Sequence, residues 1–321
     1  MRGAMAQPFP HQVTDLGFDP LAFQWHPEVW LLVLFLVGAY VYAMCVIGPR
    51  AVGPGQPVVS RVNLVCFVGA MLVLWGASDW PVHDISEEYL YSVHMLQHMA
   101  LSYFLPPLAL MATPTWLARA VIGTGRVYTA TRRLTHPVVA AVLFNGMVMI
   151  VHIPLLVNAS VSSSSPVLHY SLHVLVVATA LLMWMPVCGP IPEFRISAMG
   201  SMIYLFLQSV VPTIPAAWLT FAEDVVYKSY DTPVRLWGTS AVEDQQLAGA
   251  AMKVGGGFFL WTIIIFLFFK RFAARHADGY DYRRGRTMPD AEIVGHDEEP
   301  LTTADVEREF ASSSPHTPPG V

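Results

Sequence analysis

Five histidines lie inside otherwise apolar stretches of this sequence, and their type and spacing indicate metal chemistry. They form two pairs spaced four apart, His94 with His98 and His169 with His173, and one single residue, His152. Residues four apart share one face of a helix, so each pair would present two imidazole rings about 6 Å apart. Polar side chains are costly to bury in a membrane and are functional candidates there. The pattern therefore predicts nitrogen donors gathered for a metal ion.

Each histidine on its own also has an ordinary structural interpretation. An imidazole can cap a helix, reach toward the membrane surface or hydrogen bond a neighbouring carbonyl. The grouping favours a site, because all five are expected in the outer part of the membrane, within about 15 Å of its surface at ~1.5 Å of rise per residue. Four other histidines are expected at the opposite side, at span ends or in the tail: His136, His276, His296 and His316.

The available donors favour copper over zinc. Neutral imidazole suits copper, zinc and haem iron, and thioether sulfur adds a preference for Cu(I). Met95 and Met99 alternate with the first histidine pair, and Met149 shares a helical face with His152 and Asn145. The main alternative is a haem held by two histidines, because one imidazole from each of two facing helices would suffice.

A polar run at the start of the last apolar stretch could orient the histidines. Asp244, Gln245 and Gln246 are able to hold imidazole N–H groups as outer partners of a metal site. The alternative is that this run caps the helix that it begins, since carboxylates favour a helix N-terminus. His26, His83 and the acidic residues of the preceding loop could guide a cation inward.

Composition places these residues in an all-α polytopic membrane protein. The 321-residue chain is 54% hydrophobic and 13% charged, with a mean hydropathy of +0.48. A membrane-spanning helix needs roughly 20 apolar residues, and the long continuous runs argue against alternating strands. Seven spans are expected: Trp30–Ile47, Val62–Ala77, Leu90–Ala112, Val138–Val157, Val167–Val187, Met199–Leu219 and Leu247–Phe269. Pro106 and Pro107 interrupt the third of these, and Pro212 and Pro215 interrupt the sixth.

The distribution of basic residues predicts the orientation of the chain. Of 18 Lys and Arg residues, 14 fall on one side of the expected spans, three on the other, and Lys253 lies within a span. Positive loops stay cytoplasmic, so the N-terminus is expected outside and the C-terminus inside. We expect an extracytoplasmic lead (residues 1–27) with no cleavable signal, a seven-helix domain (28–270) and a disordered cytoplasmic tail (271–321).

The motifs argue against catalysis and transport. The sequence shows no serine–histidine–acid arrangement, phosphate loop or nucleotide motif, so we expect no enzymatic activity. A transporter using Lys253 and Asp244 is disfavoured, because the inner half of the spans carries few ionisable groups. The lipid bilayer is the expected environment of the chain. We expect no nucleic-acid partner. The oligomeric state does not follow from the sequence.

Several segments resemble CtaG-like cytochrome c oxidase assembly factors, and the resemblance covers residues ~28–270. The matching pieces are HMLQHMALSYFLPPLALMATP, the fourth expected span from HP to HIP, HYSLHVLVVATALLMWMPVCGP followed by IPEFR, and DQQLAGAAMKVGGG. The resemblance implies a protein of the bacterial plasma membrane that delivers or inserts copper into a haem-copper oxidase, with oxidase subunits as partners. A membrane b-type cytochrome that passes electrons through bis-histidine haem remains the alternative.

Overall fold

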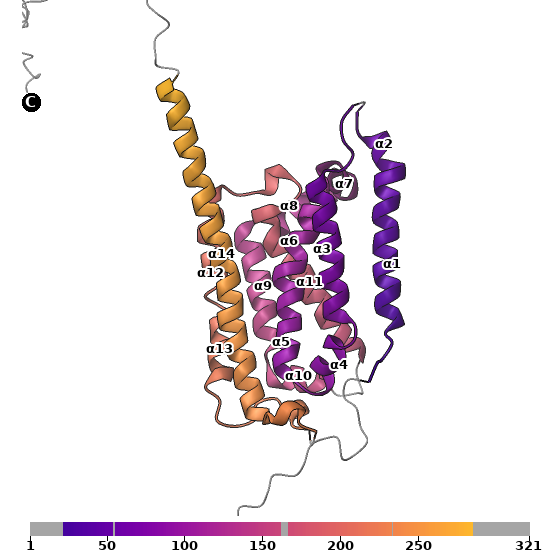
Figure 1. The fold of residues 1–321 in the computed structure, drawn as a ribbon, viewed down its shortest axis with the longest axis vertical. Coiled ribbons are helices and arrows are strands. Elements are labelled where there is room, and N and C mark those ends of the chain that lie inside the picture. Colours follow the sequence, from indigo (N-terminus) through magenta and orange to yellow (C-terminus); the bar gives the residue numbers. More distant parts are fainter. Residues whose placement is uncertain (1–21, 54, 162–165, 233, 285–321) are drawn as a thin grey trace, which may run out of the picture. The chain divides into compact units, whose positions relative to one another are not determined.

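Every regular element in the described part of the chain is helical, which confirms the all-α expectation (Figure 1). The computed structural model describes residues 22–53, 55–161, 166–232 and 234–284. The chain divides into one unit, Met1–Arg271, and a second, Phe272–Val321, whose described part is the C-terminal end of the last helix. The site lies entirely in the first unit.

The helices are short segments joined into longer rods. The first half contains α1 (Pro27–Tyr42), η2 (Ala43–Ile47), α2 (Gly48–Ala51), α3 (Arg61–Ser78), α4 (Val82–Glu88), α5 (Tyr91–Met99), η3 (Ala100–Phe104), α6 (Leu105–Ala112), α7 (Thr115–Ile122) and α8 (Arg126–Leu134). The second half contains α9 (Pro137–Val151), α10 (Pro154–Val161), α11 (Pro166–Cys188), η4 (Pro192–Phe194), α12 (Ala198–Gln208), α13 (Thr213–Thr220), η5 (Lys228–Tyr230), η6 (Leu236–Gly238) and α14 (Ala241–Arg284).

Five helical stretches are long and apolar enough to cross a membrane. They are Pro27–Ala51, Arg61–Ser78, Val167–Cys188, Ala198–Thr220 and Ala241–Ala273. The bent pair α8 and α9, with 67° between the helices, makes a sixth if it counts as one span. The continuous helical segment 91–112 is not among them, because its histidines, glutamine and prolines make it less apolar. The chain is thus a membrane protein with five or six candidate spans, and seven spans and their direction stay predictions.

The third expected span remains helical despite its two prolines. A π-helical turn, η3, ends two residues before Pro106, and such turns allow an extra residue in the helix. Pro106 has no N–H to donate to the carbonyl of Ser102. The indole Nε1 of Trp184 donates to that carbonyl instead, at 3.0 Å. The freed backbone group is therefore satisfied by a neighbouring helix, as membrane helices require.

The fourth expected span, Val138–Val157, is wrong as one helix. The structure ends α9 at Val151, places His152 at its C-cap and starts α10 at Pro154. Pro154 lacks an N–H and disfavours helical geometry in the residue before it, which explains the break. The sixth expected span contains α12 and α13, separated by a turn at residues 209–212, and the stretch Ala198–Thr220 still counts as one candidate span.

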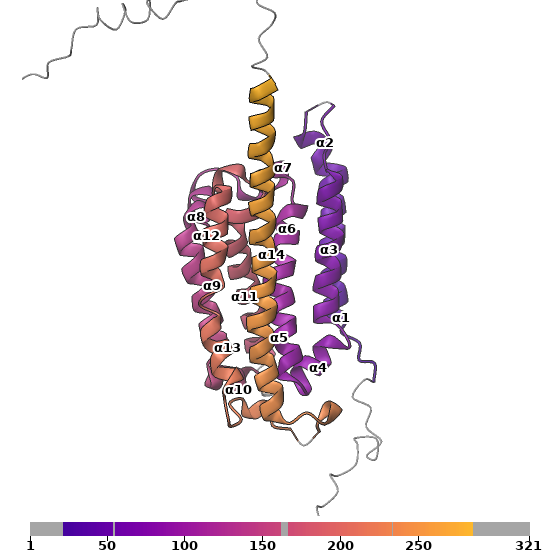
Figure 2. The same ribbon diagram turned by 60° about the vertical axis from the view of Figure 1, so that its left-hand side comes forward.

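The largest core cluster ties α5–α6, α9, α11, α12 and α14 together. Its buried members include Tyr103, Phe144, Trp184, Leu205 and Leu260. Helices α3 and α6 pack on each other, as do α9 and α11 (Figure 2). At one end of this unit lie α4 and α10, and at the other lie α7 and α8 (Figure 1). We call the first the α4–α10 end, and the orientation predicted from charge makes it extracytoplasmic.

The two expected terminal segments fall mostly outside the described residues. Of the lead 1–27, only residues 22–27 are described, and of the tail 271–321 only residues 271–284. Those tail residues are helical, because α14 continues to Arg284. The sequence there is rich in Ala and Arg, which favour helix, so helix continues past the expected boundary at position 270.

Candidate metal centre

Helices α5 and α11 bring four of the five predicted histidines together near the α4–α10 end. The ring centroids of His94 and His98 are 4.5 Å apart, and those of His169 and His173 are 4.4 Å apart. Between the helices, His98 and His173 are 4.6 Å apart, and His94 is 5.8 Å from His169. The i,i+4 spacing and the contact between the two helices therefore place these four imidazoles side by side.

Three of these residues have the geometry of a ligand set. His94, His98 and His173 each offer one ring nitrogen, and these nitrogens all lie within 4.8 Å of one another. We call them the three-histidine cluster. Three nitrogens each about 2.0 Å from one ion would lie about 3.5 Å apart, so small side-chain rotations would close the set.

The cluster contains polar atoms without partners among the described residues. His94 Nδ1, His98 Nε2 and His173 Nε2 are buried, and none of them has a hydrogen-bond partner among the described residues. An unsatisfied buried polar atom typically costs about 1–3 kcal/mol. The donor set thus fits an ion that accepts imidazole ligands.

His152 lies apart from the cluster and has a capping role. Its Nδ1 is 2.6 Å from the carbonyl oxygen of Val148, in the last turn of α9. Its Nε2 is buried and has no hydrogen-bond partner in the described residues. A cavity of about 50 Å³ is lined by both His152 and His98. His152 is therefore a neighbour of the cluster across a small gap.

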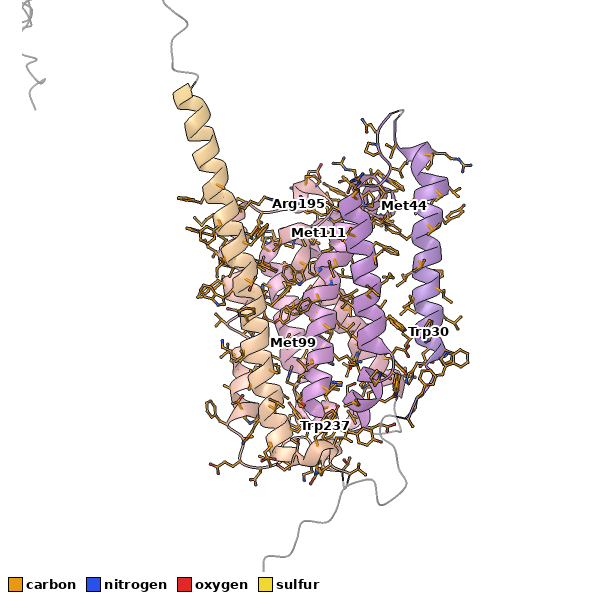
Figure 3. The ribbon with its side chains drawn as sticks, viewed as in Figure 1. Trp30, Met44, Met99, Met111, Arg195 and Trp237 are labelled. Carbon is orange, nitrogen blue, oxygen red and sulfur yellow. The ribbon has the colours of Figure 1, made fainter. Side chains whose placement is uncertain are left out.

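Two of the predicted methionines border the same small cavity. Met95 is buried, and both Met95 and Met99 line the gap between His98 and His152. Met99 is the last residue of α5, and its side chain contacts α14, where its Cε is 2.7 Å from the position that a Cβ would take on Gly255 (Figure 3). Thioethers are therefore close to the imidazoles, although the three-histidine cluster itself contains none.

The two other predicted outer partners face elsewhere. Met149 is 38% exposed, on the outside of the bundle. The Asn145 amide nitrogen donates to Ala141 O at 2.9 Å and to Gln208 Oε1 at 2.6 Å. Asn145 therefore links α9 to α12, and its shared helical face with His152 does not bring it to the cluster.

The polar run that opens α14 binds backbone groups and not imidazoles. Asp244 accepts hydrogen bonds from the backbone N–H groups of Tyr91 (2.6 Å) and Ser92 (3.1 Å). Gln245 donates to the Asp224 carbonyl, and Gln246 to the Ala222 carbonyl. This corrects the expected contacts to histidine N–H groups. The first N–H groups of a helix lack partners within it, so Asp244 caps α5 from another helix.

Helix α4 contributes a carboxylate, Glu87, that the sequence pattern did not single out as a site residue. Glu87 Oε1 is 2.7 Å from His169 Nε2 and 3.3 Å from His83 Nδ1. Burial lowers the pKa of His83, against the opposing effect of Glu87. Burial acts to raise the pKa of Glu87, but its hydrogen bond with His169 and the nearby His83 hold that pKa below its usual value. The i,i+4 spacing of His83 and Glu87 was the available signal.

The geometry disfavours a haem between the two helices. His98 and His173 face each other at 4.6 Å between centroids, which leaves no gap for a haem plane between these imidazoles. The b-type cytochrome alternative thus gains no support from this cluster.

Fold and site together define a polytopic helical membrane protein with buried imidazoles near one end of its bundle. The sequence model of the cytochrome c oxidase caa3 assembly factor family (Caa3_CtaG) matches residues 38–274. The chain belongs to this family of oxidase assembly factors, as the resemblance indicated. The family implies an interaction with the oxidase. No curated protein and no solved structure matches the chain.

Proposed function

We propose that this chain binds copper through the three-histidine cluster and helps to insert it into cytochrome c oxidase. It acts as a non-enzymatic metallochaperone of the bacterial plasma membrane, with copper as its cargo. Two observations carry the proposal: each of the three residues offers a ring nitrogen within 4.8 Å of those of the other two, and each has a buried ring nitrogen with no hydrogen-bond partner among the described residues. Family membership supplies the oxidase as the partner.

The donor types support copper as the cargo. Imidazole suits copper, and the nearby thioethers of Met95 and Met99 favour its reduced form. The cluster offers three nitrogens, whereas closed structural metal sites use four ligands. An ion held by three ligands keeps an open position, at which a ligand from the receiving protein can attach before the others release.

Binding is tested by anaerobic Cu(I) titration of the purified full-length chain against a chromophoric competitor. We expect His98→Ala to lower copper affinity by at least tenfold while the protein stays folded. His136→Ala is the matched control, since His136 is an exposed residue at the N-cap of α9. Equal copper affinity in His98→Ala and the unaltered protein would refute the assignment.

Insertion is tested in cells by the metal content of the oxidase. His94→Ala or His173→Ala is expected to leave a folded protein in the membrane and a copper-deficient oxidase. Copper and haem are measured in the purified oxidase, and haem content serves as the internal reference. Normal oxidase copper in both variants would contradict the proposal.

A further inference from the structure

A second group of histidines and carboxylates lies at the α4–α10 end, before α1 and within α4. His26 Nε2 is 2.9 Å from Asp84 Oδ1, and the rings of His26 and His83 are 4.8 Å apart. Asp84 is buried, and the side chains of His26 and His83 are 14% and 13% exposed. We call His26, His83, Asp84 and Glu87 the rim cluster. It joins the segment before α1 to α4.

Glu87 connects the rim cluster to α11. One oxygen, Oε1, lies 3.3 Å from His83 Nδ1 and 2.7 Å from His169 Nε2. His169 is 5% exposed, and its ring is 4.4 Å from that of His173. His173 belongs to the three-histidine cluster. A continuous series of possible ligands thus runs from His26 through Glu87 and His169 to the buried site, with each adjacent pair in contact.

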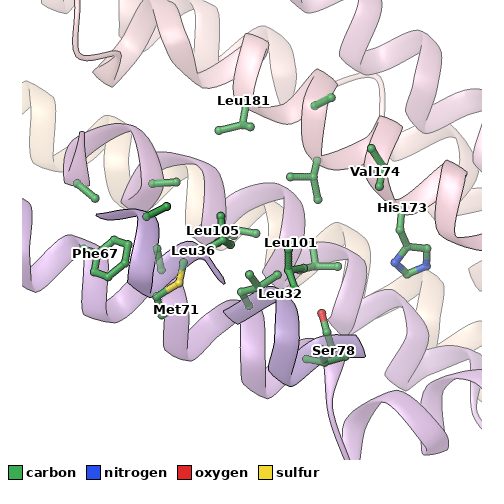
Figure 4. A pocket seen from close by; sticks show the side chains of 18 of the residues that line it. Leu32, Leu36, Phe67, Met71, Ser78, Leu101, Leu105, His173, Val174 and Leu181 are labelled. Carbon is green, nitrogen blue, oxygen red and sulfur yellow. The ribbon is translucent and has the colours of Figure 1, made fainter. Parts of the chain in front are cut away.

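A large cavity borders this series of residues. The cavity has a volume of about 940 Å³ and is bounded by α1, α3, α5–α6 and α11. Its polar lining includes Glu28, His83, Glu87, Gln97, His169 and His173. Figure 4 shows His173 at one end of the cavity and Phe67 at the other. Toward Phe67 the lining is mainly apolar, with Leu36, Met71 and Leu105. The imidazoles and carboxylates of the cavity are therefore gathered toward its His173 end.

We infer that the rim cluster and His169 form an entry relay that loads copper into the three-histidine cluster. The inference rests on the proposed function and adds the route by which copper reaches the three-histidine cluster. The ion passes by ligand exchange, from the Glu87 carboxylate and His169 to His173 and then to the full set. Its oxidation state does not change. The Glu87 and His169 atoms form new bonds to the ion as outer ligands leave, and these break as His173 binds.

The donor types give the relay a direction. Carboxylate oxygens are hard ligands, whereas imidazole and thioether suit copper better. The relay begins with two carboxylates beside His26 and His83, and it ends among imidazoles alone, with methionines nearby. Binding of copper therefore strengthens along the series, and an ion captured at the rim moves inward without an energy source.

The kinetics of loading separate the relay from the final site. Purified full-length protein is mixed anaerobically with a chromophoric Cu(I) complex, and the rate and final extent of copper transfer are measured. We expect Glu87→Gln to slow loading at least fivefold and to leave the final stoichiometry unchanged. Glu87→Asp, which keeps the carboxylate, should recover part of the rate.

Glu88→Gln is the matched control, because it removes the same charge from the same helix at an exposed position. It should load at the rate of the unaltered protein. Equal loading rates for Glu87→Gln and Glu88→Gln would overturn the relay and leave the proposed copper site standing. A loss of final stoichiometry in Glu87→Gln would also overturn it, because Glu87 would then be a ligand of the final site. Failure of the unaltered protein to bind copper would remove the proposed function and the relay together.

Discussion

Asp244 is expected to hold the first histidine-bearing turn of α5 in place, although it touches no histidine of the cluster. Its two oxygens accept the N–H groups of Tyr91 and Ser92, and all three residues are buried. His94 follows in the next turn of α5, where its backbone N–H bonds to Leu90. Substitution of Asp244 by Ala should therefore loosen the turn that positions His94.

The magnitude follows from the two hydrogen bonds lost. An unsatisfied buried donor costs about 1–3 kcal/mol, so the loss of both bonds in Asp244→Ala should destabilise the protein by about 2–6 kcal/mol. Asp244→Asn replaces one of the two acceptor oxygens by an NH₂ group, which would face a backbone N–H donor instead of accepting from it. The destabilisation should therefore approach that of Asp244→Ala. Substitution of residues that orient metal ligands typically lowers metal affinity by about 10–100-fold, and we expect Asp244→Ala to lower copper affinity within that range.

The assay combines thermal unfolding in detergent with competitive Cu(I) titration of the same samples. Glu223→Ala is the matched control, because it removes one carboxylate at an exposed position of the loop before α14. It should change neither property. Unchanged unfolding temperature and copper affinity in Asp244→Ala would refute the reasoning that this capping contact supports the site.

Other positions give independent predictions. Gly249→Ala should destabilise the protein by about 1–3 kcal/mol, because its Cβ would lie 2.6 Å from the Ala216 carbonyl oxygen. Gly257→Ala is the control, because its Cβ would meet nothing within 4 Å, and it should leave stability unchanged. Thermal unfolding of both variants measures the difference. Trp184→Phe should lower the unfolding temperature, because it removes the N–H donated to Ser102 beside the proline break. A reduced-minus-oxidised absorbance spectrum of the purified protein should lack haem bands, and sharp bands would support the cytochrome alternative.

The clustering of histidines was predictable because helical spacing is local. Pairs at i and i+4 share a face whatever the tertiary structure, and the expected order of the spans put both pairs at one level. The structure accordingly brings His94, His98 and His173 together. The family resemblance also rests partly on the segments that contain these histidine pairs, HMLQH and HYSLH.

Other features depended on contacts that spacing does not encode. His152 follows the last residue of α9, where helix ends before Pro154, so its ring caps α9 and stays across a gap from His98. The partners of Asp244 lie 153 and 152 positions earlier in the chain, and no local pattern relates them. Glu87 was hidden in an acidic loop, where a solvated carboxylate is the usual expectation.

Copper binding by the imidazoles of α5 and α11 can be observed by X-ray absorption of the copper-loaded full-length chain, with His98→Ala measured beside it. We expect a first coordination shell with imidazole scattering from three histidines, reduced to two in His98→Ala. A shell without imidazole scattering, or one unchanged in His98→Ala, would refute copper binding at this cluster.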